Sequence, residues 1–174
     1  LHLHYPQCNV VVAEQLNYAL ERISDLPGPP IDRRYICFYN ADSVVGARTF
    51  TLLLGLVETG TPVIQQTSLF LWNIPELIRG GSYGAAGFGM YQSCWTLIHE
   101  IPRYLFSQCY TKVLPRWFQE RSLVHCVGHG LVIRYDVLQR AGGIPVSVIG
   151  GEDLALGFIL RVLGYGIEPF PILE

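Results

Sequence analysis

The chain has 174 residues, of which 50% are apolar and 15% are charged, and its formal net charge is −2. This composition suits one folded domain with a buried core and excludes an intrinsically disordered chain. Lys and Arg do not cluster in the way that binding to a phosphate backbone requires, so we expect no nucleic-acid partner.

The first part of the chain predicts helices that alternate with strands. Apolar residues recur at helical spacing over residues 9–24, and Asn9 can cap that helix. The aromatic run at residues 35–39 is typical of a short buried strand. A second helix is predicted over residues 44–58 and a second strand over residues 62–66.

The middle of the chain predicts one irregular segment and one long helix. Residues 68–82 contain Pro75, Gly80 and Gly81, which favour an irregular conformation. A helix is predicted over residues 83–106, with Pro102 ending or kinking it. Its four large aromatic residues are interpreted as core, with an acceptor-binding wall as the alternative: Tyr83, Phe88, Tyr91 and Trp95.

The last part of the chain returns to short strands and helices. Strands are predicted at residues 123–126 and 131–133, on either side of a Gly-His-Gly turn. Helices follow at residues 135–141 and 152–163, and a closing strand is predicted at residues 166–171. Alternating strands and helices predict an α/β architecture with a largely parallel sheet.

Cysteine usage and hydropathy restrict the class of protein further. The five cysteines are odd in number and include no CxxC pair, which argues against a disulfide framework and a thiolate zinc site. No apolar run reaches the ~18–20 residues that a membrane-spanning helix needs. We therefore expect reduced cysteines and a cytoplasmic protein.

The first candidate site follows the strand at residues 35–39. Asn40 and Asp42 are two residues apart, so on an extended backbone their side chains point to the same side. Ligands bind at the carboxyl ends of strands in open α/β sheets, and Mg²⁺ and Mn²⁺ prefer carboxylate oxygens. The equally plausible alternative is that Asp42 or Ser43 caps the following helix.

The second candidate is the pair Glu152 and Asp153 at the start of a predicted helix. Carboxylates in a first turn are stabilised by the helix dipole by ~0.3–1 kcal/mol, and this structural explanation is the simpler one. The functional alternative is a general base that takes the proton of an attacking hydroxyl.

The third candidate is the sequence Gly128-His129-Gly130. Two glycines around one polar residue let the backbone approach a ligand closely. A tight turn between two short strands explains the same residues without any ligand.

The order of these motifs resembles that of family 2 glycosyltransferases. The Asn-Ala-Asp-Ser sequence after the aromatic strand resembles the DxD segment of that family. Residues 128–134, 136–138 and 142–145 resemble the stretch that precedes the acidic motif, and residues 151–157 and 163–167 resemble the ED motif with its helix and following strand. Residues 15–20 match the helix that leads into the DxD strand, so the resemblance covers nearly the whole chain.

The resemblance implies a fold of the GT-A type, which is Rossmann-related. It implies a mixed, mainly parallel sheet flanked by helices, from which the N-terminal strand–helix units that hold the nucleotide are absent. Residues 1–174 are accordingly expected to form one partial glycosyltransferase domain, an internal fragment of a catalytic domain.

The resemblance also implies a reaction: inverting transfer of a sugar from a nucleoside-diphosphate sugar to a hydroxyl of a glycan or lipid acceptor, with Mg²⁺ or Mn²⁺. By position, Asp42 would bind the metal, Asp153 would be the catalytic base, and Glu152 would position the acceptor or the base. The donor and acceptor would be bound by the remaining candidates, Asn40, Gly128, His129 and Gly130.

Departures from the family pattern keep other functions open. Asn40 stands where the family usually has an Asp, which favours a degenerate, non-catalytic glycosyltransferase-like domain that binds a partner or a glycan. A nucleotidyltransferase is a third reading. Relatives of this kind often carry membrane helices beyond this region, so association with the cytoplasmic face of a membrane is expected through segments outside this chain.

Overall fold

A computed structural model of the chain describes residues 5–6, 11–40, 45–66, 74–102, 126–148 and 150–170. The elements before residue 67 are α1 (Val12–Ser24), the 3₁₀ turn η1 (Ile31–Arg33), β1 (Tyr35–Phe38), α2 (Ala47–Glu58) and β2 (Val63–Gln66). The elements after residue 73 are α3 (Ile74–Arg79), α4 (Tyr83–Trp95), the π-helical turn η2 (Thr96–Glu100), β3 (Leu131–Arg134), α7 (Tyr135–Arg140), α8 (Glu152–Val162) and β4 (Glu168–Phe170).

The four strands form one mixed sheet in the order β1-β3-β2-β4, so the predicted α/β class is confirmed. Strands β1, β2 and β4 run in one direction, and β3 runs in the opposite direction between β1 and β2. The prediction of a mainly parallel sheet therefore holds for strand direction but is wrong for strand pairing, because only the β2–β4 pair is parallel.

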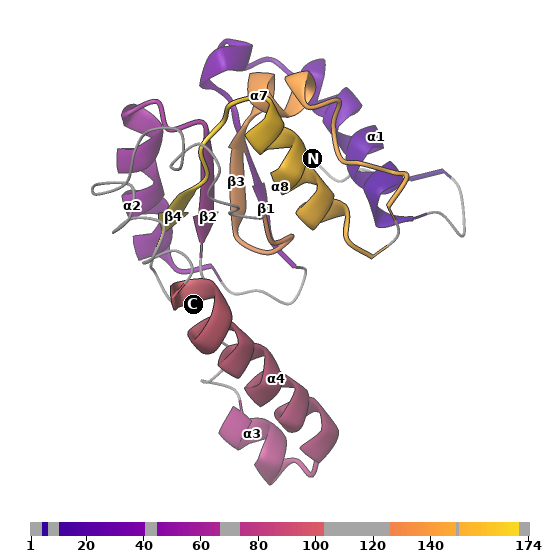
Figure 1. Cartoon of the computed structure of the whole chain (residues 1–174), viewed down its shortest axis with the longest axis vertical. Coiled ribbons are helices and arrows are strands. Elements are labelled where there is room, and N and C mark those ends of the chain that lie inside the picture. Colours follow the sequence, from indigo (N-terminus) through magenta and orange to yellow (C-terminus); the bar gives the residue numbers. More distant parts are fainter. Residues whose placement is uncertain are drawn as a thin grey trace.

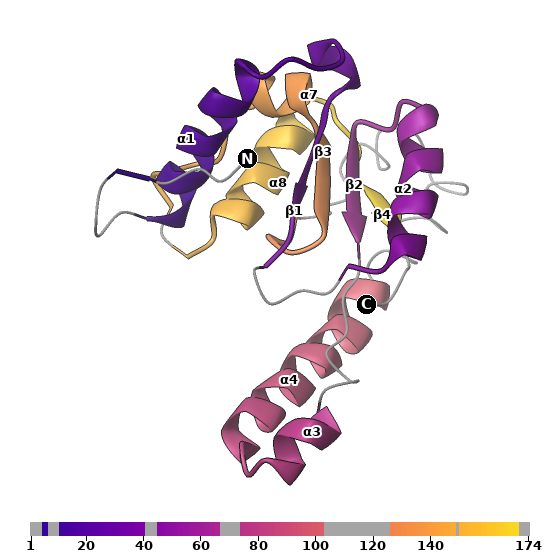
Figure 2. The same cartoon turned by 180° about the vertical axis from the view of Figure 1, so that it is seen from behind.

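Helices cover both faces of this sheet (Figures 1 and 2). On one face, side chains of α1, α7 and α8 pack with Val63, Leu131 and Ile133 of the strands. On the other face, Leu53 of α2 packs with Ile64 and Val132. Adjacent strand residues thus point to opposite faces, and because helices cover both faces the central strands β2 and β3 are buried on both sides.

Most of the predicted elements are present. The helices α1, α2, α7 and α8 and the strands β1 to β4 lie within one to three residues of their predicted bounds. Helix α2 begins at Ala47 with Gly46 in the N-cap position, so neither Asp42 nor Ser43 holds that position. Asn9, Asp42, Ser43 and most of the strand predicted at 123–126 lie outside the described residues.

Two predictions for the middle of the chain are wrong. The segment predicted to be irregular contains α3, whose first turn includes Pro75 and whose end is followed by Gly80 and Gly81. The aromatic residues of the long helix are not core: Tyr83, Phe88 and Tyr91 are 70%, 64% and 60% exposed.

Helices α3 and α4 pack against each other and project from the body that the sheet forms (Figure 1). None of the helices in the described ranges is long and apolar enough to cross a membrane.

Two segments that carry the family resemblance are joined by one side chain. The amide of Asn17 in α1 donates to the carbonyl oxygen of Ile144 and accepts from its N–H, each at 2.8 Å. Gly143, just before Ile144, has φ +82°, and a Cβ there would lie 2.6 Å from Asn17 Oδ1. The turn after α7 is therefore held against α1 by a paired amide and needs glycine for space.

Gly143→Ala is expected to destabilise the protein by about 1–3 kcal/mol more than Gly142→Ala, because Asn17 must release Ile144 to admit the new methyl group. Gly142 is the matched control, since it has the same φ of +82° and, among the described residues other than its chain neighbours, no atom within 4 Å of the place that an added methyl group would take. Urea unfolding of both variants measures the difference. The difference should vanish in an Asn17→Ala background, and a difference that persists there contradicts the explanation.

Candidate active site

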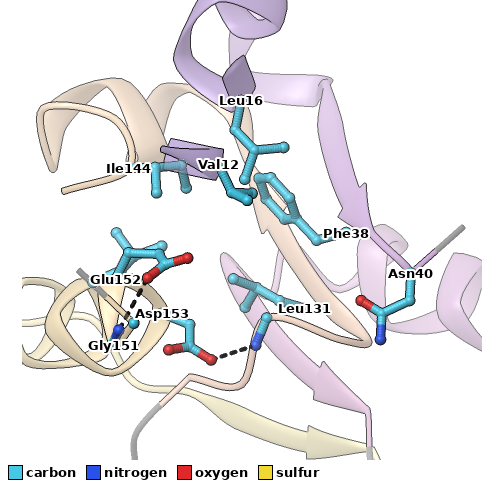
Figure 3. A pocket seen from close by; sticks show the side chains of 12 residues that line it. Val12, Leu16, Phe38, Asn40, Leu131, Ile144, Gly151, Glu152 and Asp153 are labelled. Atoms are coloured by element: carbon cyan, nitrogen blue, oxygen red, sulfur yellow. Dashed lines mark hydrogen bonds between the residues drawn. The ribbon is translucent and has the colours of Figure 1, made fainter. Parts of the chain in front are cut away.

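A cavity of about 330 Å³ lies at the carboxyl end of β1, between α1 and the start of α8 (Figure 3). Its apolar walls come from Val12, Leu16, Phe38, Leu131, Ile144 and Leu156. Its remaining lining residues are Asn40, Gly128, Gly150, Gly151, Glu152 and Asp153. Four predicted site residues from three distant segments thus surround one cavity of the size typical of small-molecule sites.

The Asp153 carboxylate joins the start of α8 to the loop before β3. Its Oδ2 accepts a hydrogen bond from the Gly128 N–H at 2.7 Å, and its Oδ1 accepts one from the Leu154 N–H at 2.8 Å. The second bond satisfies a free N–H of the first helical turn, as the structural explanation of this acidic pair requires. The first bond is not part of the helix and fixes the carboxylate beside the cavity.

Glu152 is held less tightly than Asp153. Its Oε2 accepts a hydrogen bond from the Gly151 N–H at 3.0 Å, directly before the helix. Figure 3 shows both carboxylates on the same side of the cavity, with Asn40 on the opposite side. A group bound between them would meet negative charge from α8 and a neutral amide from the end of β1.

The three residues of the Gly-His-Gly sequence have different environments. Gly128 is exposed at the cavity. The His129 ring packs edge-on against Tyr39 with centroids 5.5 Å apart, and its Nδ1 lies 3.5 Å from the Asn40 backbone N–H, which donates to it. His129 and Gly130 do not line the cavity, so the structure does not bring them to the ligand side with Gly128.

Gly130 continues the sheet rather than contacting a ligand. Its N–H donates to the Phe38 carbonyl oxygen and its own carbonyl oxygen accepts from the Gln66 N–H, both at 2.8 Å. Its φ is +72°, and a Cβ there would lie 2.9 Å from Gln66 Cβ. The structural alternative, a tight turn at the edge of the strands, therefore accounts for Gly130.

Gln65 organises this loop, although its sequence context does not predict it as a site residue. Gln65 is 1% exposed, and its side chain bonds to the backbone of Val127 and His129. Two consecutive glutamines in a predicted strand were the available signal, because the strand is buried and a buried amide needs hydrogen-bond partners.

The oxygen ligands around the cavity do not by themselves form a metal centre. Amide and carboxylate oxygens are the donors that Mg²⁺ and Mn²⁺ prefer. Within the described ranges, however, no three His, Cys, Asp or Glu side chains converge in a way that could hold an ion. Asp42, the predicted metal ligand, lies outside those ranges.

Cys126 is buried, close enough to the Asp153 carboxylate for that charge to act on its thiol. Burial, and to a lesser extent the charge of Asp153, raise the pKa of the Cys126 thiol to about 12. At pH values between the ordinary thiol pKa and about 12, the folded protein therefore keeps the Cys126 thiol protonated, whereas the unfolded chain releases this proton.

The stability of the protein is expected to fall as the pH rises above about 9, because ionisation of Cys126 then favours the unfolded chain. Urea unfolding from pH 7 to 11 measures this dependence. Cys126→Ala removes the thiol and should make the alkaline fall less steep, and the remaining slope comes from groups such as Cys37 and Tyr35, whose pKa values burial also raises. An unchanged slope in that variant would assign the alkaline loss to other groups.

Models of known protein families, curated proteins and solved structures were each compared with the chain, and none of them matches it.

Proposed function

We propose that the chain is part of the catalytic domain of a metal-dependent, inverting glycosyltransferase of the family 2 type, with a nucleoside-diphosphate sugar as donor. The observation that carries the proposal is the shared cavity: Asn40 after β1 and the pair Glu152 and Asp153 at the start of α8 line it together. Each motif has a structural explanation by itself, but those explanations do not require the motifs to meet.

The proposed reaction assigns one task to each of these groups. The Asp153 carboxylate takes the proton of the acceptor hydroxyl, whose oxygen bonds to the anomeric carbon as the bond from that carbon to the phosphate oxygen breaks. The nucleoside diphosphate leaves with the electron pair. The Gly128 N–H holds one carboxylate oxygen in place, and Glu152 positions the acceptor beside it.

The proposal keeps Asp42 as the ligand of Mg²⁺ or Mn²⁺. When bound, such an ion neutralises the charge that develops on the diphosphate. Asn40 lies two residues before Asp42 and lines the cavity, so its amide is placed to hydrogen-bond the donor.

The proposal extends to the GT-A type of fold. Its support is the mixed sheet with three strands in one direction and helices on both faces. Among the described strands, β1 lies at an edge of the sheet. The nucleotide-holding strand–helix units of the family have a free strand there to pair with.

A second function, a non-catalytic binding module, is favoured by Asn40. An amide in place of a carboxylate brings no charge to a metal ion, which weakens a catalytic donor site. Such a module would still use the cavity to bind a glycan or a partner.

The full-length protein distinguishes the two functions. With Mn²⁺ and UDP- or GDP-sugars, we expect release of the nucleoside diphosphate, and calorimetry with UDP and GDP should show binding that EDTA abolishes. Binding of neither nucleotide together with no release from any sugar nucleotide would reject the transferase and favour the binding module.

A further inference from the structure

The side chain of Gln65 spans the loop that holds Asp153. Its Nε2 donates to the carbonyl oxygens of His129 at 2.9 Å and Gln66 at 3.1 Å. Its Oε1 accepts from the Val127 N–H at 2.8 Å. The buried amide is thus fully used, and two of its three bonds go to the residues on either side of Gly128.

The loop in turn fixes the Asp153 carboxylate. The Gly128 N–H, whose neighbours Gln65 binds, donates to Asp153 Oδ2 at 2.7 Å. One continuous series of hydrogen bonds therefore runs from Gln65, at the carboxyl end of β2, through the loop backbone to Asp153. Each bond in such a network limits the freedom of the next.

We propose that Gln65 is a positioning residue for Asp153, acting through the backbone of Val127, Gly128 and His129. The hydrogen-bond series stands on the geometry alone, and its consequence for turnover rests on the proposed function. Loss of the Gln65 amide frees the loop, so that Gly128 no longer holds the carboxylate in the orientation that the acceptor hydroxyl needs. Groups that orient a reacting residue in this way typically change activity by about 10–100-fold.

Gln66 provides a matched control at the next position. It is 2% exposed, compared with 1% for Gln65, and its side chain lies on the opposite face of the strand. Its Oε1 accepts from the Tyr39 hydroxyl at 2.6 Å, and its Nε2 has no hydrogen-bond partner among the described residues. Replacing Gln66 therefore removes a buried amide from the same strand without touching the bonds to Val127 and His129.

The experiment compares Gln65→Met with Gln66→Met in the full-length protein. NMR hydrogen exchange of the Gly128 amide and steady-state turnover with a sugar nucleotide are the two readouts. In Gln65→Met we expect exchange of the Gly128 amide to rise about tenfold or more, and kcat to fall about 10–100-fold with the donor KM unchanged. In Gln66→Met neither should change by more than about twofold.

A second variant keeps the test decisive if Gln65→Met does not fold. Gln65→Glu has the same size and keeps an oxygen for the Val127 N–H, but as a carboxylate it lacks the donors to the carbonyl oxygens of His129 and Gln66. It should give the same two changes. An unchanged Gly128 amide in the Gln65 variants, or equal changes in the Gln65 and Gln66 variants, would overturn the inference.

The two proposals fail separately. In one outcome, the Gly128 amide exchanges faster in the Gln65 variants, but the wild-type protein releases no nucleoside diphosphate. This result supports the positioning of Asp153 by Gln65 and rejects the transferase. Normal turnover in a Gln65 variant with a freed Gly128 amide rejects the positioning role and leaves the transferase intact.

Discussion

Asp153→Asn is expected to lower the release of nucleoside diphosphate by about 10²–10⁴-fold, because an amide cannot take the proton of the acceptor hydroxyl. The substitution keeps the size of the side chain and one oxygen that can accept from a backbone N–H. Binding of UDP or GDP should therefore change little while turnover is lost. Coupled-enzyme detection of the released nucleotide measures the rate, and calorimetry measures the binding.

Glu14→Gln is the control for the structural explanation of Asp153. Glu14 is likewise a carboxylate in the first turn of a helix, but it is exposed on α1 and does not line the cavity. Glu14→Gln removes a favourable interaction with the helix dipole and nothing at the cavity, so turnover should be unchanged in this variant. Full turnover in Asp153→Asn would reject this residue as the base.

Gly130→Ala is expected to destabilise the protein by about 3 kcal/mol, because the added methyl group meets both an unfavourable backbone conformation and a close neighbour. The left-handed backbone at φ +72° disfavours any Cβ, and the added atom would also lie 3.1 Å from the Gln66 carbonyl oxygen. Gln66 belongs to the hydrogen-bonded sheet and its N–H donates to the Gly130 carbonyl oxygen, so it cannot move away without disturbing that bond. Urea unfolding followed by circular dichroism measures the loss.

Gly60→Ala separates the two contributions. Gly60 has a similar φ of +77°, and in the described part of the chain no atom beyond its sequence neighbours lies within 4 Å of the position of an added Cβ. Its replacement should cost only the backbone contribution of about 1–2 kcal/mol. Equal losses in the two variants would show that the contact with Gln66 does not matter.

Periodic apolar residues predicted most of the helices and strands correctly. Proline and glycine residues were a less accurate guide to where elements begin and end. Helix α1 follows from its repeated apolar residues, of which Ala13 and Leu20 are buried. Helix α3 was missed because Pro75 and Gly80 were interpreted as breaking regular structure. Proline in a first turn and glycine after a last turn are instead the residues that start and end a helix.

The direction of β3 could not be read from its sequence. Strands β2 and β3 are buried almost throughout because helices cover both faces of the sheet. Such strands lack the alternation of polar and apolar residues that is typical of a strand with one face exposed to solvent. Their apolar runs therefore predicted strands with two covered faces, which is correct, and favoured parallel pairing, which is wrong for two of the three pairs.

Four of the predicted site residues line one cavity, but the hydrogen bonds that connect them were not predictable from the sequence. The order of the motifs predicted that Asn40 and Asp153 belong to one site, and the structure places both at one cavity. The bond from Gly128 to Asp153 and the role of Gln65 depend on how the loop packs on β2, which spacing along the chain does not encode. A buried amide in a strand is a signal that its partners exist, without saying which they are.

The most direct test of the proposed donor site uses the paramagnetism of Mn²⁺. In the full-length protein with UDP or GDP, Mn²⁺ should broaden the amide resonances of Asn40, Gly128 and Asp153, and Mg²⁺ in its place should leave them sharp. Helix α4 projects away from the sheet, so its amides serve as the reference (Figure 2). Selective broadening at the cavity is the result that we predict, and broadening elsewhere or none at all in the presence of either nucleotide would contradict it.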